Sequence, residues 1–171
     1  MSADYAIRAA RASELEALSA IERRAAELFR GVGLAWVTEL PLMPISLLEA
    51  GRLYDLLWVV ERGGVPVAFL LASVVDRELH IEELDVDPAH QRRGIGRALI
   101  ERAAREGRAR GLRSMTLLTF RDVPWNAPFY ASAGFVAIDL HAMGPELTAK
   151  AEVDATRMRA SSRVAMRRTL D

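Results

Sequence analysis

The chain has 171 residues, of which 51% are hydrophobic, and its formal net charge is zero because 23 lysines and arginines balance 23 aspartates and glutamates. A chain of this length can bury one substantial core, so we expect a single domain over residues 1–171. The balanced charge argues against a nucleic-acid coat or a membrane-surface protein. The absence of cysteine excludes disulfides, thiolate metal ligands and a cysteine nucleophile.

Further exclusions come from the apolar and metal-binding patterns. No apolar stretch approaches the roughly 18 residues of a membrane span, and the start, MSADYAIRAARASE, has no signal-peptide core. We therefore expect a soluble cytoplasmic protein. His90 and His141 have no neighbours at ligand spacing, so we expect no metal site. Lys150, Gln91 and Asn126 are the only residues of their types, a bias that fits a GC-rich genome.

The first half of the chain is predicted to contain one helix and four strands. The apolar stripe over 13–29 is helical, with Ser13 as its N-cap. The glycines and prolines of 33–51 indicate a loop with a broken helix. The expected strands are 5–8, 56–61, 65–75 and 77–86, with a hairpin turn at Arg62-Gly63-Gly64.

The second half alternates helices with strands. The expected helices are 96–111 and 126 or 127 to 132, and the expected strands are 114–120, 135–138 and 164–168. We expect the segment from Arg163 to Arg168 to form an edge strand that its arginines protect. An antiparallel meander followed by a βαβ unit predicts an α/β fold with a mixed sheet.

The segment 84–97 is the most informative part of the chain. An apolar strand stops at a proline, a polar turn carries Gly94 and Gly96, and an amphipathic helix follows at once. Unpaired amides at such a helix N-terminus favour an anion, and glycines let a phosphate approach the backbone. Positive charge for the phosphate oxygens comes from Arg92, Arg93 and Arg97. We expect a phosphorylated ligand, and the alternative is an ordinary arginine-rich helix start.

Two motifs follow one another along the chain. They are Gln91-x-x-Gly94-x-Gly96 after a strand, and Phe129-Tyr130-Ala131-Ser132-Ala133-Gly134-Phe135 after the next βα step. Together, in this order, they resemble the Gcn5-related N-acetyltransferase family. The resemblance covers roughly residues 53–138. It implies a single domain with the order β-α-α-β-β-β-α-β-α-β-β and a splayed central sheet. It also implies acetyl-CoA as co-substrate and an amine acceptor.

The resemblance implies a cofactor site on these residues. The strand would offer main-chain groups of Leu84 and Val86 to the pantetheine arm, by the logic of strand addition. The diphosphate would bind the turn formed by Gln91, Arg92, Arg93, Gly94, Ile95, Gly96 and Arg97. The family often places an asparagine seven residues before the tyrosine, but that position is Val123 here. Asn126 either caps the following helix or reaches the cofactor, and we favour capping.

The resemblance also implies catalytic roles. Strand alternation places His80 and Glu82 on one face and Glu83 and Asp85 on the other, unless a bulge changes the register. An ammonium substrate must lose a proton, and in the family the base commonly lies on this strand. Glu82 fits best, with His80 second or as a relay. The alternative is that both are solvated strand residues. Tyr130 would protonate the departing thiolate, or would simply pack its ring.

The expected function is direct acetyl transfer from acetyl-CoA to a primary amine in a ternary complex. The acceptor is a small-molecule amine or a peptide N-terminus. The alternative is a non-catalytic acyl-CoA sensor that kept the cofactor turn. Arginines on helix 96–111 alternate with Glu101 and Glu106, which indicates a solvated face rather than a nucleic-acid surface. A homodimer through the C-terminal strands is a further possibility.

Overall fold

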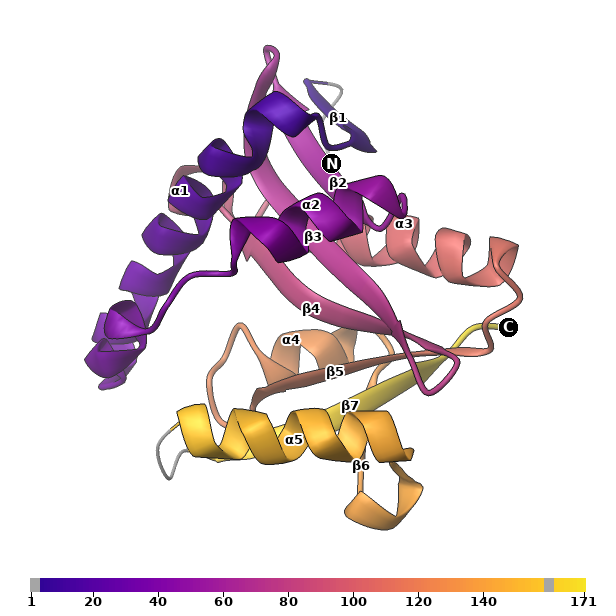
Figure 1. The fold of residues 1–171 in the computed structure, drawn as a ribbon. Helices are drawn as coiled ribbons and strands as arrows, with labels where there is room; N and C mark the ends of the chain where they lie inside the picture. The colour runs from indigo at the N-terminus through magenta and orange to yellow at the C-terminus, as the bar shows by residue number, and fades with distance from the viewer. Residues whose placement is uncertain (1–3, 159–161) are drawn as a thin grey trace. The chain divides into compact units, whose positions relative to one another are not determined.

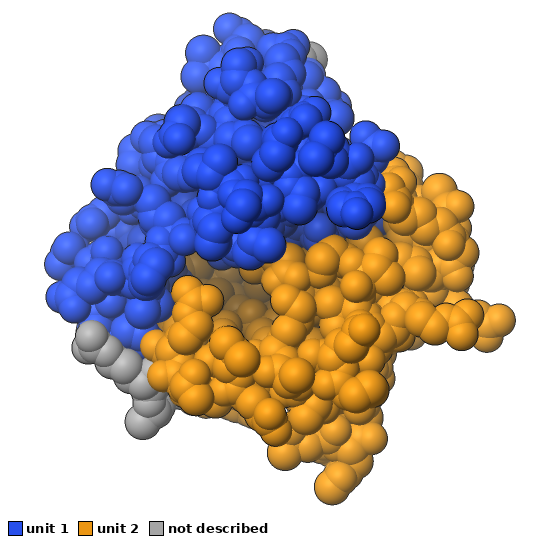
Figure 2. Space-filling model, in the orientation of Figure 1, with its two compact units in different colours: residues 1–72, 83–103 blue, residues 73–82, 104–171 orange. Residues whose placement is uncertain are grey.

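The computed structural model describes residues 4–158 and 162–171. Over these residues the fold is α/β, with five α-helices and a mixed sheet of seven strands in the order β1-β2-β3-β4-β5-β7-β6 (Figure 1). The chain divides into two compact units (Figure 2). Unit 1 comprises residues 1–72 and 83–103, and unit 2 comprises residues 73–82 and 104–171. No helix of the described ranges is long and apolar enough to cross a membrane.

Unit 1 is built on an antiparallel meander. Its elements are β1 (Tyr5–Ala9), α1 (Leu15–Ala26), α2 (Ile45–Leu53), β2 (Leu57–Arg62), most of β3 (Val65–Val75), the end of β4 (Glu78–Val86) and the start of α3 (Ile95–Ala109). β2 pairs with both β1 and β3. Gly63 and Gly64 have φ values of +57° and +82°, as a two-residue hairpin turn requires. This confirms the predicted hairpin.

Helices α1 and α2 pack on one face of β2 and β3. Leu18, Ile21 and Leu48 from the helices are fully buried in one cluster with strand residues. The strand members of the cluster are Leu57, Val59, Phe69 and Leu71. The predicted stripe of α1 is thus confirmed, because its apolar spacing places one face of the helix on the sheet.

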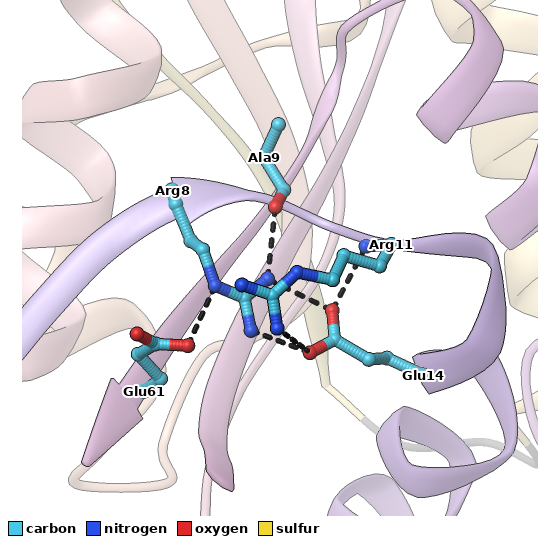
Figure 3. Close-up of polar contacts among 5 residues, drawn as sticks. All are labelled: Arg8, Ala9, Arg11, Glu14 and Glu61. Atoms are coloured by element: carbon cyan, nitrogen blue, oxygen red, sulfur yellow. Dashed lines mark hydrogen bonds and ion pairs between the residues drawn. The ribbon is translucent and has the colours of Figure 1, made fainter. Parts of the chain in front are cut away.

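A charged cluster fixes the start of α1 to the meander (Figure 3). The Arg8 guanidinium donates to Glu61 at 2.6 Å and to both carboxylate oxygens of Glu14. Glu14 also accepts the Arg11 N–H at 2.8 Å and is only 8% exposed. The hydrogen bond from Arg8 holds the pKa of Glu14 below its ordinary value, against the opposing effect of burial.

Unit 2 combines parallel and antiparallel pairing. It holds the remaining parts of β3, β4 and α3 with β5 (Ser114–Phe120), α4 (Ala127–Ser132), β6 (Val136–Ile138), α5 (Pro145–Arg157) and β7 (Arg163–Thr169). β7 pairs antiparallel with the whole of β5 on one side and with β6 on the other. The parallel pairing of β4 with β5 is short, covering only Leu79–Ile81 against Met115–Leu117.

Helix α5 is held at three points within unit 2. The Asp76 carboxylate accepts the N–H groups of Glu146 (3.1 Å) and Leu147 (2.8 Å) in the first turn of the helix. Glu146 in return accepts the Asp76 N–H at 2.6 Å. Lys150 binds Glu82 in the middle, and Asp154 pairs with Arg163 of β7 at 2.6 Å. Asp76 thus caps a helix that lies far along the chain.

The structure corrects four predictions. Helix α5 was not predicted at all. Residues 45–53 form a regular helix rather than part of a loop with a broken helix. Ser13 is not an N-cap, because it lies inside a 3₁₀ turn in which Glu14 accepts the Arg11 N–H. β7 is not an edge strand, because β6 pairs along its outer side and takes the edge position.

Candidate active site

The turn between β4 and α3 is fixed within unit 1 by side chains. Asp87 accepts the Ala89 N–H at 3.0 Å, caps a 3₁₀ turn over Pro88–His90, and forms an ion pair with Arg24 of α1 at 2.7 Å. The Tyr5 hydroxyl lies 3.1 Å from His90 Nδ1. These side-chain contacts therefore fix the backbone directly before the turn that leads into α3.

Residues Gln91 to Gly94 form the tight turn that leads into α3. Gln91 donates its side-chain amide to the Val86 carbonyl at 3.1 Å, which closes the turn onto the end of β4. Arg92 and Gly94 have φ values of +59° and +77°, and a non-glycine residue in this left-handed region is under strain. Gly96 lies inside α3 and has no positive φ, so only Gly94 of the two glycines has a conformation that favours glycine.

The N-terminus of α3 presents main-chain donors. The first helical hydrogen bond runs from the Ala98 N–H to the Gly94 carbonyl at 3.0 Å. The N–H groups of Ile95, Gly96 and Arg97 therefore precede the hydrogen-bond ladder of the helix. The three arginine side chains of the segment are exposed. The turn thus combines amide donors, the positive end of a helix dipole and guanidinium groups, a combination that suits an anion.

The end of β4 offers main-chain groups next to this turn. Leu84 and Val86 are half-buried, and the pairing of β4 with β5 has already ended at Ile81. The Val86 carbonyl is engaged by Gln91, as described above. A strand without a neighbour along one side can pair with an extended ligand by strand addition.

Asp85 is a half-buried acid with one buried carboxylate oxygen, and the sequence did not single it out. Its Oδ2 atom is buried and has no hydrogen-bond partner in the described part of the chain. Burial raises the pKa of Asp85 well above its ordinary value, and the charges of Glu83 and Glu22 raise it further. Glu22 lies on α1, where its carboxylate accepts the Met43 N–H at 2.9 and 3.0 Å.

In unit 2, Glu82 lies in a network of polar side chains. Its Oε1 accepts the Ser73 hydroxyl at 2.6 Å, and Lys150 Nζ lies 2.8 Å from Oε1 and 2.9 Å from Oε2. Burial raises the pKa of Glu82, but the combined effect of its charged and hydrogen-bonding neighbours is larger and opposite. The pKa of Glu82 therefore lies below its ordinary value. These neighbours are His80, Lys150 and Ser73.

His80 is buried next to Glu82. Its side chain is 3% exposed, and its Nδ1 lies 3.0 Å from the hydroxyl of buried Thr116. Burial lowers the pKa of His80 to about 4, so the ring is uncharged at neutral pH. At neutral pH the cation beside Glu82 among the described residues is therefore Lys150, whereas His80 carries a charge only at acid pH.

Tyr130 and Asn126 lie at α4 in the same unit. Tyr130 is 8% exposed and its ring packs against Phe129 and Phe135, with centroids 5.2 and 5.8 Å away. Asn126 stands at the N-cap position but makes no side-chain cap, so the predicted capping role is wrong. It donates instead to Thr119 of β5 at 2.8 Å, and its Oδ1 is buried without a partner in the described residues.

Comparison with known proteins identifies the family. The family model described as "Acetyltransferase (GNAT) family" matches residues 21–135, which include the turn, Glu82 and Tyr130. The chain belongs to the GNAT acetyltransferase family. The resemblance seen in the two sequence motifs is thus confirmed.

The GNAT chain is also similar to individual proteins. It is 30% identical to mycothiol acetyltransferase of Cellulomonas flavigena over 119 residues, which are 68% of this chain and 34% of that protein. The chain thus spans about a third of the length of this relative. N-acetylglutamate synthase from Neisseria gonorrhoeae, solved with coenzyme A and N-acetyl-glutamate, superposes with a TM-score of 0.76 at 17% identity, covering 100% of this chain and 36% of that one. PaiA N-acetyltransferase from Thermoplasma acidophilum, solved with coenzyme A, has a TM-score of 0.71 at 16% identity, covering 99% of both chains.

Sequence reasoning missed part of this candidate site. His80 and Glu82 lie together as the alternation predicted, but their partners Lys150, Ser73 and Thr116 were not foreseen. The one available signal was that Lys150 is the only lysine of the chain. Within residues 4–158 and 162–171, no group of three or more His, Asp or Glu side chains could hold a metal ion.

Proposed function

We propose that this GNAT chain transfers the acetyl group of acetyl-CoA directly to a primary amine. The proposal rests on one observation above all. A left-handed glycine, Gly94, immediately precedes the first-turn amides of α3, and Gln91 fastens this turn to β4. Such a turn suits the diphosphate of coenzyme A, because the amides and the helix dipole stabilise negative charge.

The residues of this chain fit coenzyme A at two further places. The main chain of β4 at Leu84 and Val86 would pair with the amides of the pantetheine arm. Asn126 Oδ1 is a buried acceptor without a partner in the described residues, and an amide N–H of the same arm would satisfy it. When bound, acetyl-CoA supplies the thioester whose acetyl group is transferred.

Unit 2 carries the groups proposed for proton transfer. Glu82 would take the proton of the acceptor ammonium, with neutral His80 as its neighbour. Tyr130 would give a proton to the departing thiolate, since a phenol with a reference pKa of ~10 is a suitable donor to a thiolate whose conjugate acid has a pKa near ~8.5. The acceptor is a small-molecule amine or a peptide N-terminus.

A binding measurement combined with a thiol-release assay tests the proposal. Calorimetry with coenzyme A should show binding, and a panel of primary amines with acetyl-CoA should include at least one that releases thiol in proportion to enzyme. Absence of binding would contradict the cofactor site. Binding without thiol release from any amine would favour the acyl-CoA sensor over the enzyme.

A further inference from the structure

The carboxylate proposed as the base already holds a primary amine of the same chain. Lys150 is the only lysine, and its Nζ contacts both carboxylate oxygens of Glu82 at 2.8 and 2.9 Å. The Ser73 hydroxyl, 2.6 Å from Oε1, holds the carboxylate from another strand. The Lys150 side chain is 37% exposed, which makes it more accessible than the Glu82 side chain with which it pairs, at 20%.

We infer that Lys150 is an acetylation site of the chain's own activity, with Nζ as an intramolecular acceptor. The inference rests on the proposed function, because it uses the same base and donor. A lysine side chain carries a primary amine, which is the acceptor class of the proposed function. The amine of Lys150 also contacts Glu82, the proposed base. Glu82 is also two residues along β4 from Leu84, where the pantetheine arm is proposed to bind.

The transfer balances with the groups named. Glu82 accepts one proton from the Lys150 ammonium, which frees the nitrogen lone pair. The bond from Nζ to the acetyl carbon forms, and the bond from that carbon to the thioester sulfur breaks. The nitrogen gives its remaining surplus proton to water, and the thiolate takes a proton from Tyr130. The proton held by Glu82 then passes through solvent to the Tyr130 phenolate, which restores both side chains. One ammonium and one thioester thus become one amide, one thiol and one proton.

The product would change the charge around Glu82. Acetylation replaces a cation by a neutral amide. Of the other groups facing this carboxylate, His80 on β4 is uncharged at neutral pH and Ser73 on β3 is neutral. Besides Glu82 itself, the acids that act on His80 are Glu78 and Asp154. Loss of the Lys150 charge therefore leaves Glu82 without its cation and raises its pKa.

Tryptic mapping after incubation with acetyl-CoA tests the inference. Trypsin cleaves unmodified protein after Lys150, and acetylation blocks that cleavage, so fragment 122–157 stays intact. We expect wild-type protein to acquire one acetyl group there, with a rate constant independent of protein concentration. Glu82→Gln should slow the reaction at least tenfold. A rate no faster than that of the urea-unfolded chain would overturn the inference.

A relocated lysine provides the matched control. The double variant Lys150→Arg, Arg157→Lys keeps one lysine on α5 but moves it away from Glu82. It should be acetylated only at the rate of the unfolded chain, whereas modification as fast as in wild type would overturn the inference. Thiol release with an added amine, without modification of Lys150, would overturn the inference and leave the proposed function intact. Absence of both would contradict the two together.

A second measurement needs no acetyl-CoA. An NMR titration of the Glu82 carboxyl should give a higher midpoint in Lys150→Gln, which mimics the acetylated side chain, than in wild type. An unchanged midpoint would show that Lys150 is not the cation at this carboxylate and would overturn the inference.

Discussion

Substitution of Gly94 by alanine is the sharpest test of the cofactor turn. Gly94 has φ +77°, where a residue with a Cβ costs roughly 1–2 kcal/mol. Gly94 also directly precedes, along the chain, the amides proposed to meet the diphosphate. A hydrogen bond to a charged group contributes roughly 1.5–3 kcal/mol. Loss of one such contact would weaken coenzyme A binding about tenfold to a hundredfold.

Gly111→Ala is the matched control for this substitution. Gly111 has φ +73° and no atom within 4 Å of an added Cβ, so it carries the same backbone penalty with no steric contact. Urea unfolding should show a similar loss of stability in both variants. Calorimetry should show weaker coenzyme A binding in Gly94→Ala alone. Equal affinity in the two variants would refute the assignment of the turn to the diphosphate.

Three other outcomes are expected. Tyr130→Phe should lower turnover about a hundredfold with nearly unchanged coenzyme A affinity, and unchanged turnover would remove the hydroxyl from the mechanism. Glu14→Gln should cost roughly 2 kcal/mol at pH 7 by urea unfolding. Because Arg8 lowers the folded pKa of Glu14, this difference should shrink as the pH falls through that pKa, and a constant difference would contradict the pairing. The folded pKa of Asp85 is raised, so its folded state loses stability as pH rises above about 4, by up to ~1.4 kcal/mol per unit. Asp85→Asn should therefore be more stable than wild type at pH 7 but not at pH 3, and a lower stability at pH 7 would contradict the burial argument.

Local patterns predicted the elements that carry the cofactor turn. The change from an apolar strand to a glycine-containing turn and an amphipathic helix depends only on neighbouring residues, and β4, α3 and β5 lie close to their expected bounds. The hairpin at Gly63–Gly64 was equally local. Periodicity also placed His80 and Glu82 on one face, because strand alternation needs no tertiary information.

Long-range contacts explain what the sequence did not reveal. Helix α5 buries only Leu147, so it has no apolar stripe that periodicity could detect. Its cap is Asp76, which lies 70 and 71 positions before the residues it binds, so no neighbouring residue indicates where the helix begins. Asn126 had the right residue type and position for a cap, but Thr119 of β5 binds its side chain instead. The position of β7 inside the sheet depends on pairing with β6, which arginine spacing alone does not predict.

The capping of α5 by Asp76 makes one helix conditional on a distant turn. A helix of 13 residues is marginal in water by itself, so a fragment without the β3–β4 turn would leave Lys150 on a fluctuating chain, with no carboxylate held beside it. Acetylation of Lys150 would then occur only in molecules that had completed their tertiary structure. Nascent or truncated chains would not be acetylated at this position.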